Sequence, residues 1–295
     1  MRVLLTGSTG QLGLALRRSV PKNIDLICPT RQELDLSKPE FFEEFIDYCR
    51  PDWILNAGAY TSVDLAENNS DECFSINAQA LQTFSKLLYG SDAKILQIST
   101  DYVFDGTKGS PYITSDLTNP KNQYGYSKAI AEETVLSLPG SKVLRTSWVY
   151  GREGSNFCLK ILELHRSKFE DNSPLNVVVD QVGSPTSTNT LSNICWLMLL
   201  NECPDILHWT DAGCASWYDF AIAIGEIALE LGLLEGKASV VPVKSSDFPS
   251  IAKRPSFSSL DCFLTYKSFN LTPSHWKYEL YQVLNAVKEG RLCSL

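Results

Sequence analysis

Gly7-Ser8-Thr9-Gly10-Gln11-Leu12-Gly13 sets the architecture of this chain. The stretch follows a short apolar run, residues 3–6, and opens a helical pattern over residues 11–20. Glycines at a strand-to-helix turn permit a tight bend, close approach of a pyrophosphate and close helix–strand packing, and the helix N-terminus supplies free N–H groups. The stretch therefore predicts a dinucleotide site. The residues expected to contact it are Gly7, Gly10, Gln11, Leu12 and Gly13.

β-rich runs and helical stretches alternate through the first half of the chain. The predicted strands are residues 3–6, 25–28, 53–56, 95–99 and 142–146, and the predicted helices between them are residues 11–20, 38–49, 71–89 and 124–138. Ser37-Lys38-Pro39-Glu40 is typical of a capping box with proline in the first turn. Alternation of this kind means βαβ units, so we expect an α/β fold with a Rossmann-type, doubly wound parallel sheet.

The pattern changes after Gly151, where a smaller α/β lobe is expected to close over one edge of the sheet. Helices are predicted over residues 156–168, 188–201, 217–232 and 277–289, with β-rich pieces at 175–179, 206–210 and 239–243. We assign residues 1–150 and about 186–213 to the dinucleotide-binding domain. Residues from about 151 to 185 and from 214 to 295 are assigned to the smaller, substrate-binding lobe.

The composition argues against a membrane-spanning, secreted, metal-binding or nucleic-acid-binding protein. The longest wholly apolar run, residues 194–200, is far too short to span a membrane, and the first residues lack a signal peptide. The nine cysteines form no C-x-x-C pair and the three histidines are far apart, so we expect reduced thiols, a cytoplasmic protein and no metal site. A formal net charge of −8 argues against nucleic-acid binding.

The end of the second predicted strand bears on the choice of cofactor. An NAD site usually has an acidic residue there, bonded to the ribose hydroxyls. This strand ends Ile27-Cys28-Pro29-Thr30-Arg31, in which Thr30 and Arg31 are suited to a 2′-phosphate. We therefore predict NADP(H) as the preferred cofactor, with NAD(H) possible. Further residues expected at the cofactor site are Asp35, Leu36, Gly58, Ala59 and Tyr60.

Tyr124 and Lys128 lie four residues apart, so they share one face of the predicted helix. We expect the ammonium to lower the pKa of the phenol, and the hydroxyl of Thr100, at a strand end, to share a substrate oxygen with it. One such tyrosine–lysine spacing is about what chance supplies in a chain of this composition. The pair becomes a candidate catalytic site only because a dinucleotide site is predicted upstream of it.

With these motifs in order, the chain resembles the dTDP-4-dehydrorhamnose reductase family of the extended short-chain dehydrogenases/reductases. The resemblance covers nearly the whole length. Besides the glycine-rich turn, it rests on Ser99-Thr100-Asp101-Tyr102-Val103-Phe104, Tyr124-Gly125-Tyr126-Ser127-Lys128, Arg145-Thr146-Ser147-Trp148-Val149-Tyr150-Gly151, Asp180-Gln181-Val182-Gly183-Ser184-Pro185-Thr186 and Arg254-Pro255.

The resemblance implies roles for these residues. Tyr124 is implied as the proton donor, Lys128 as the ligand of the nicotinamide ribose, and Thr100 as a donor to the substrate oxygen. Asp101, Trp148 and Arg254 are implied as substrate-binding residues, with Trp148 against the sugar ring. The implied reaction is hydride transfer to C4 of dTDP-4-keto-6-deoxy-L-mannose, which gives dTDP-L-rhamnose.

Two other functions stay open at this point. One is reduction or epimerisation of another nucleotide-linked keto sugar, since a fold and its catalytic residues do not determine the substrate. The other is a non-catalytic, NADP-binding regulatory subunit like that of eukaryotic methionine adenosyltransferase. The expected partner is a nucleotide-sugar substrate, and a homodimer is possible. We find no counterpart of the C-terminal acidic cluster that some members use for a magnesium-linked dimer.

Overall fold

The computed structural model describes residues 1–248 and 250–292, and its centre is a six-stranded parallel sheet. The strands lie in the order β10-β5-β4-β3-β1-β2, and each neighbouring pair is parallel. Their bounds are β1 Arg2–Thr6, β2 Asp25–Ile27, β3 Trp53–Asn56, β4 Lys94–Thr100, β5 Lys142–Thr146 and β10 Ile206–His208. The order reverses between β1 and β3, which is where such sheets bind ligands. The predicted doubly wound parallel sheet is confirmed.

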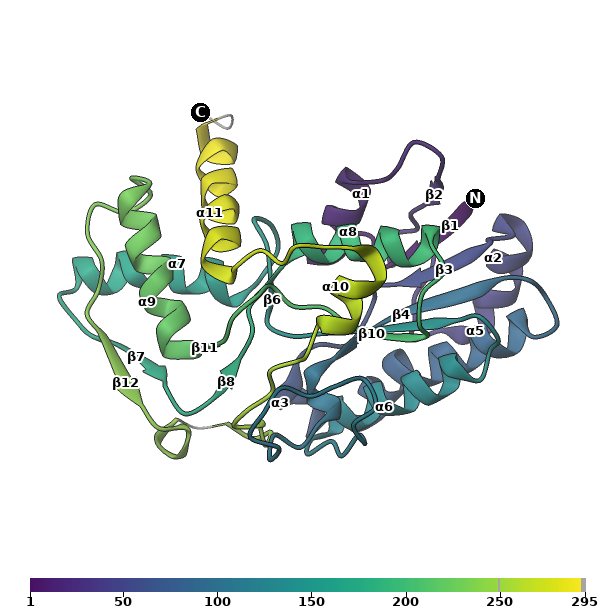
Figure 1. Cartoon of the computed structure of the whole chain (residues 1–295), viewed down its shortest axis with the longest axis horizontal. Coiled ribbons are helices and arrows are strands. Elements are labelled where there is room, and N and C mark those ends of the chain that lie inside the picture. The colour runs from purple at the N-terminus through teal and green to yellow at the C-terminus, as the bar shows by residue number, and fades with distance from the viewer. Residues whose placement is uncertain (249, 293–295) are drawn as a thin grey trace.

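Helices cover both faces of the sheet (Figure 1), because successive strand residues point to opposite sides. Leu4 of β1 belongs to the same buried cluster as Phe84, whereas Leu5 belongs to the cluster of Leu16 on the other face. The helices of the first face are α2 Phe42–Cys49, α5 Ala80–Leu88 and α6 Gln123–Leu136. Those of the second are α1 Gln11–Arg18 and α8 Thr188–Leu200. Apolar surface on both sides explains why these strands are hydrophobic throughout.

A smaller lobe lies to the left of the sheet in Figure 1 and has its own core. Leu162, Phe220 and Leu280 meet there, one from each of its three long helices. Its elements are α7 Phe157–Glu170, α9 Trp217–Glu230, α11 Trp276–Leu292 and the parallel pair β7 Leu175–Val178 and β12 Val240–Val243. Two further pairs are β6 Val149–Tyr150 with β9 Thr186–Ser187, and β8 Val182–Gly183 with β11 Ala215–Ser216.

Short helices complete the described structure. They are α3 Val63–Ala66, α4 Ser70–Phe74, a π-helical segment Ser75–Gln79, α10 Phe263–Phe269 and single 3₁₀ turns at Pro39–Phe41, Asp101–Val103 and Ser245–Asp247. The helix predicted over residues 71–89 is therefore interrupted by the π-helical segment. The seven-residue α10 was not predicted, because it is short and ends at Asn270 in a left-handed conformation.

The predicted capping box at Ser37-Lys38-Pro39-Glu40 is wrong. The Ser37 hydroxyl donates to Asp35 Oδ1 at 2.8 Å instead of capping a helix, and Lys38 precedes the 3₁₀ turn without a side-chain cap. The α-helix itself begins at Phe42. A short carboxylate two residues upstream competes for the hydroxyl that the box would need.

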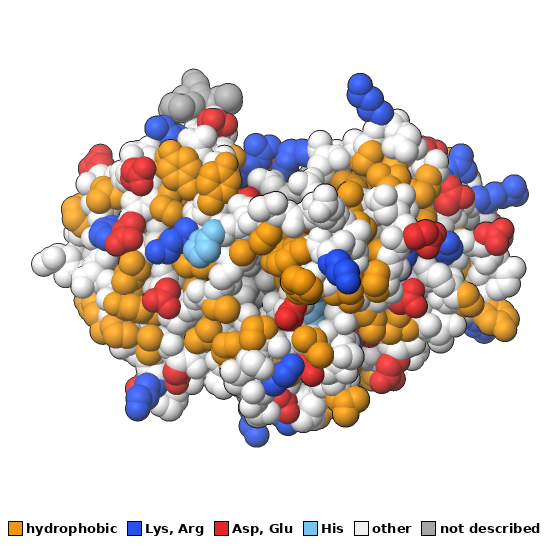
Figure 2. All heavy atoms as spheres, in the orientation of Figure 1, with side chains coloured by type: hydrophobic (Ala, Val, Ile, Leu, Met, Phe, Trp, Pro, Cys, Tyr) orange, Lys and Arg blue, Asp and Glu red, His pale blue; other side chains and the backbone are white. Residues whose placement is uncertain are grey.

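The surface carries both signs of charge. Figure 2 shows acidic and basic side chains interspersed over the face drawn. Within residues 1–248 and 250–292, no helix has the length and apolar character needed to cross a bilayer.

Candidate active site

A pocket of about 660 Å³ lies at the carboxyl ends of β1, β3, β4 and β5, where the strand order reverses. Most residues predicted for the site line this pocket. They are Gly7, Gly10, Gln11, Leu12, Arg31, Asp35, Leu36, Gly58, Ala59, Thr100, Asp101, Tyr124, Lys128 and Trp148. Segments from the N-terminal glycines to Trp148 thus converge on one cavity.

Four residues predicted for the site do not line the pocket. They are Gly13, Thr30, Tyr60 and Arg254. Gly13 packs beneath the turn, where a Cβ atom would collide with the Gly7 carbonyl. The backbone N–H and the hydroxyl of Thr30 both donate to Glu33, at 2.7 and 2.9 Å.

Arg254 is also engaged elsewhere. Its guanidinium forms an ion pair with Asp64 at 2.6 Å and donates to the Ser250 hydroxyl. Asp64 in addition accepts hydrogen bonds from the Ser250 hydroxyl and the Ala252 N–H, at 2.9 and 3.0 Å. The loop that carries Arg254 is therefore docked onto α3 by a single carboxylate.

The glycine-rich turn has the shape that a pyrophosphate requires. Gly7 has φ +65°, and a Cβ atom there would lie 2.5 Å from the Gly58 nitrogen, so the ends of β1 and β3 approach closely. The first turn of α1 contains no acidic residue, and its N-cap, Gly10, offers no side-chain cap. The N–H groups and the positive end of the helix dipole are thus left for an anion, and these residues fit a dinucleotide.

Lys128 is buried beside the end of β4. Its ammonium donates to the Ile98 carbonyl at 2.6 Å, and 3% of the residue is exposed. Burial lowers the pKa of the Lys128 amine to about 8. The negative charge of Glu132, one turn further along α6, acts in the opposite direction and limits this decrease. The side chain therefore still carries its charge at neutral pH.

The pKa of Tyr124 moves in the direction opposite to the one expected. Burial raises the pKa of the Tyr124 phenol well above its ordinary value, and a hydrogen bond with the Thr100 side chain opposes the rise. The expected net lowering of this pKa is not found among the protein's own side chains, because burial outweighs the hydrogen bond that opposes it. The phenol therefore stays protonated at neutral pH, as a proton donor must.

Besides Gln11 Oε1 at the glycine-rich turn, two polar atoms of the pocket wall lack a hydrogen-bond partner among the described residues, Asp101 Oδ2 and Thr146 Oγ1. Asp101 is 2% exposed, and burial raises the pKa of its carboxyl to about 7. Buried polar atoms in native proteins are nearly always bonded. These two are therefore suited to polar groups of a bound molecule.

Asn77 supports the site and was not predicted from the sequence. It lies in the π-helical segment, is 1% exposed, and binds the backbone of Tyr60 on both sides: its Oδ1 accepts from Tyr60 N at 2.8 Å and its Nδ2 donates to Tyr60 O at 3.1 Å. The same Nδ2 donates to the Ser127 hydroxyl at 2.9 Å. Asn77 thus ties the loop after β3 to the helix of Tyr124.

A buried ion pair lies behind the pocket. Glu132 of α6 and Arg145 of β5 are 2.7 Å apart, and the Ser99 hydroxyl donates to Glu132 at 2.5 Å. Ser99 directly precedes Thr100, and Glu132 follows Lys128 by one helical turn. The pair therefore joins the elements that carry Thr100 and Lys128.

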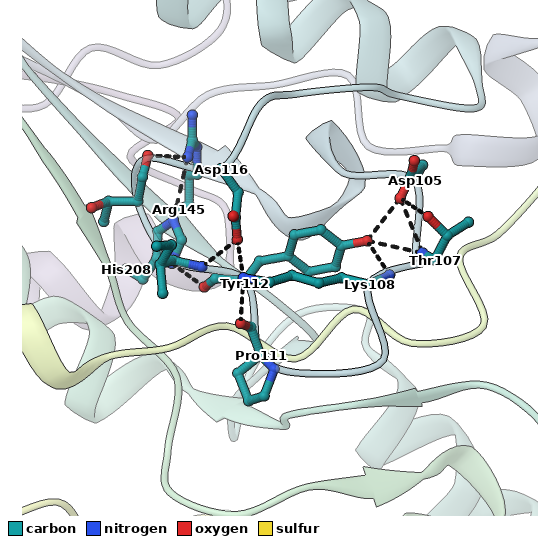
Figure 3. Close-up of polar contacts among 10 residues, drawn as sticks. Asp105, Thr107, Lys108, Pro111, Tyr112, Asp116, Arg145 and His208 are labelled. Atoms are coloured by element: carbon teal, nitrogen blue, oxygen red, sulfur yellow. Dashed lines mark hydrogen bonds and ion pairs between the residues drawn. The ribbon is translucent and has the colours of Figure 1, made fainter.

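Arg145 extends this network to the loop of residues 105–116 (Figure 3). Its Nη1 donates to the Thr114 carbonyl at 3.2 Å and lies 3.3 Å from His208 Nε2. Burial and the Arg145 charge lower the pKa of His208 to about 3, so the ring is neutral. The network assigns the ring proton to Nδ1, which lies 3.1 Å from the Tyr112 carbonyl. The Tyr112 hydroxyl in turn donates to Asp105 at 2.8 Å.

Comparison with known proteins places the chain in a family. The model described as "RmlD substrate binding domain" matches residues 1–289. A dTDP-4-dehydrorhamnose reductase from Aggregatibacter actinomycetemcomitans is 36% identical over 291 residues, which cover 96% of this chain and 98% of the relative. The chain belongs to the dTDP-4-dehydrorhamnose reductase family.

Solved structures of this family have the same fold. A dTDP-4-dehydrorhamnose reductase from Clostridium acetobutylicum superimposes with a TM-score of 0.89 at 33% identity, covering 98% of this chain and 100% of that one. A second, from Bacillus anthracis, is described in complex with NADP and has a TM-score of 0.86 at 31% identity, covering 96% and 98%. The part of this reductase-family chain that the structure describes contains no cluster of metal-ligating side chains.

Proposed function

We propose that this protein reduces the C4 keto group of dTDP-4-keto-6-deoxy-L-mannose to dTDP-L-rhamnose with NADPH. The observation that carries the proposal is the convergence of Thr100, Tyr124 and Lys128 with the glycine-rich turn on one pocket. The named relatives support it, since they are dTDP-4-dehydrorhamnose reductases of nearly the same length.

NADP(H) is the proposed cofactor, and its pyrophosphate would lie on the glycine-rich turn. Arg31 lines the pocket, its side chain is 72% exposed, and its ion pair with Asp35 is long, at 3.7 Å. A loosely held guanidinium is available to a 2′-phosphate. Thr30 contributes little in this arrangement, because Glu33 accepts both of its hydrogen bonds. The complex of the related Bacillus anthracis protein supports NADP(H).

The bound cofactor would supply the hydride, and the protein's own residues would supply the proton and the alignment. As the C4 carbonyl becomes an alkoxide, the Tyr124 O–H bond breaks and its proton goes to the substrate oxygen. The Thr100 hydroxyl stabilises the resulting phenolate, which is the direction in which it already shifts the pKa of Tyr124. The charged Lys128 adds a positive potential beside both groups.

Asp101, Trp148 and Arg254 are the proposed substrate-binding residues. Asp101 has a carboxyl with a pKa near neutrality and one unpaired oxygen, which suits a sugar hydroxyl. Trp148 offers aromatic surface to the pocket. Arg254 would have to exchange its ion pair with Asp64 for the substrate diphosphate.

The state of the cysteines agrees with a reducing compartment. The described cysteines, which exclude Cys293, are all unpaired, and a buried thiol such as that of Cys158 has its pKa raised by desolvation. We therefore propose a cytoplasmic location. We also propose the division into a cofactor domain and a substrate lobe at about residues 151, 186 and 214.

The test is a panel of nucleotide-linked 4-keto sugars, each incubated with the protein and NADPH while absorbance of the reduced cofactor is followed. We expect the dTDP-linked 4-keto-6-deoxy-L-mannose to give the highest kcat/KM and dTDP-L-rhamnose as product. A higher kcat/KM on another sugar would support the alternative reductase. Tight NADPH binding without turnover, in conditions where a known reductase is active, would support the regulatory subunit.

A further inference from the structure

Trp148 adopts a backbone conformation that needs outside support. Its φ is +47°, a left-handed value that is rare for a bulky residue. Such conformations persist where the surrounding structure holds them, often at functional sites. Two bonds hold this backbone: the Thr186 N–H donates to the Trp148 carbonyl at 3.2 Å, and the adjacent Ser147 hydroxyl donates to the Ser184 carbonyl at 2.7 Å.

The indole ring of Trp148 is stacked on Trp217. The two ring centroids lie 3.4 Å apart and the planes differ by 2°. Trp148 lines the pocket and Trp217 does not, so Trp217 covers one face of the ring from the side of the smaller lobe. Trp148 keeps part of its surface on the pocket side, since it still lines the cavity. Phe157 packs against Trp217 in turn, with centroids 4.4 Å apart.

Gly183 packs on the other face of the same indole, beside Nε1 and Cε2. A Cβ atom at Gly183 would lie 2.6 Å from Trp148 Nε1 and 2.7 Å from Cε2. The register of the β8–β11 pair places Gly183 opposite Ala215, two residues before Trp217. Trp217 itself starts α9 behind a complete capping box, in which Ser216 and Asp219 bond each other reciprocally. The support of Trp148 is thus made of rigid elements.

We propose that Trp217 and Gly183 are positioning residues for substrate recognition, which hold the indole of Trp148 between them in the pocket wall, where it contacts the sugar ring of the nucleotide-linked substrate. This inference rests on the proposed function. The occupant it fits is a ring that carries apolar C–H groups, such as a 6-deoxy sugar, because an indole presents mainly apolar surface. The substrate's nucleotide and the cofactor are bound by other residues, so their affinities should not depend on Trp217.

Trp217→Leu and Gly183→Ala test the proposal by different routes. The first removes the stacking partner, and the second adds a methyl group that displaces the indole from its other face, without requiring a new backbone conformation, since Gly183 does not have a positive φ. An aromatic pair contributes free energy equal to roughly a three- to tenfold change in an equilibrium constant. We therefore expect each variant to raise KM for the sugar nucleotide about three- to tenfold, with kcat and the dissociation constant for NADPH near those of the wild type. Trp217→Phe should restore part of the KM.

Ile227→Ala is the matched control. It removes a side chain that packs on the same lobe core, from the same helix as Trp217. Loss of stability alone should leave KM unchanged, so a KM rise in Ile227→Ala equal to that of Trp217→Leu would overturn the proposal. Unchanged KM in both Trp217→Leu and Gly183→Ala would overturn it as well.

A spectroscopic measurement separates this proposal from the proposed function. Two stacked indoles give an exciton couplet in the far-ultraviolet circular dichroism spectrum, which needs no substrate. We expect the couplet in the wild type, its loss in Trp217→Leu and Trp148→Leu, and its change in Gly183→Ala. A couplet of wild-type intensity in Trp217→Leu would overturn the proposal. A wild type that shows the couplet but reduces no sugar nucleotide would contradict the proposed function instead.

Discussion

Tyr124 is the proposed proton donor because its phenol stays protonated at neutral pH and is hydrogen-bonded with the Thr100 side chain. Removal of its hydroxyl leaves the pocket shape intact and removes the proton donor. We expect Tyr124→Phe to lower kcat at least about a hundredfold, the usual effect of losing a general acid, while NADPH still binds. Steady-state kinetics and a cofactor titration measure the two quantities. Tyr126→Phe, an exposed tyrosine on the same helix, is the control and should retain wild-type turnover.

Arg31 is the residue on which the proposed preference for NADP(H) depends. A charge-assisted hydrogen bond to a phosphate corresponds to roughly a ten- to hundredfold effect on affinity. Arg31→Ala should therefore lower kcat/KM for NADPH by about that factor and leave kcat/KM for NADH nearly unchanged. Lys22→Ala removes the same charge from an exposed position and should change neither value. If Arg31→Ala lowers kcat/KM equally for NADPH and NADH, Arg31 does not bind the 2′-phosphate.

The sequence could predict the lining residues that follow strand ends or share a helix face. Thr100, Tyr124 and Lys128 belong to this class, because strand and helix periodicity places them at one edge of the sheet. Asn77 and Glu132 could not be predicted, since their partners lie on other elements and are met through three-dimensional packing. The direction of the Tyr124 pKa was beyond prediction for the same reason, because burial sets it.

At the scale of elements, the ion pair of Glu132 and Arg145 couples α6 to β5 and, through Ser99, to β4. Glu132→Gln leaves the guanidinium buried without its counter-charge, so we expect a loss of about 3–5 kcal/mol in the free energy of unfolding. Urea unfolding followed by circular dichroism measures it. Glu133→Gln, an exposed neighbour on the same helix, should be near neutral. Similar stabilities of the two variants would show that the pair contributes little.

Most elements were predictable because their periodicity is strong, and the bounds of β3 and β5 agree with the prediction. The exceptions have local physical causes. Ser37 bonds Asp35 instead of capping a helix, and Asn77 lies in a π-helical segment that no period-based pattern reveals. α10 is too short for its hydrophobic spacing to be distinguished from a loop.

At the scale of the whole molecule, buried carboxyls make stability depend on pH. Burial raises the pKa of Asp101 and of Asp211 to about 7, above the ordinary value of an unfolded aspartate. A raised folded-state pKa gives stability that is complete at low pH and is lost as the pH rises toward and through 7. Asp101→Asn should therefore gain roughly 2 kcal/mol relative to the wild type between pH 5 and pH 8.

Urea titrations of both proteins at a series of pH values measure this gain. Asp211→Asn should show the same trend, since its carboxyl is buried, is not part of the pocket lining, and accepts hydrogen bonds from Thr190 and Ser187. A difference from the wild type that does not change with pH, in either variant, would contradict the assigned ionisation.

The arrangement of two lobes was predictable only in outline. A change of composition after Gly151 indicated the smaller lobe, and its separate core of α7, α9 and α11 agrees with that outline. The boundaries at about 151, 186 and 214 stay predictions, as does a homodimer. Short strand pairs such as β8 with β11 join distant segments, and two-residue strands leave no periodic pattern in a sequence.

The central claim is that hydride is delivered to C4 of a dTDP-linked keto sugar beside Tyr124. The most direct measurement uses NADPH labelled with deuterium on one face of the nicotinamide C4, with the opposite face labelled in a second reaction. We predict that one of the two labels appears at C4 of dTDP-L-rhamnose, seen by NMR and mass spectrometry, and that Tyr124→Phe transfers little of it. Product without deuterium from either label, or deuterium at another carbon, would contradict the account.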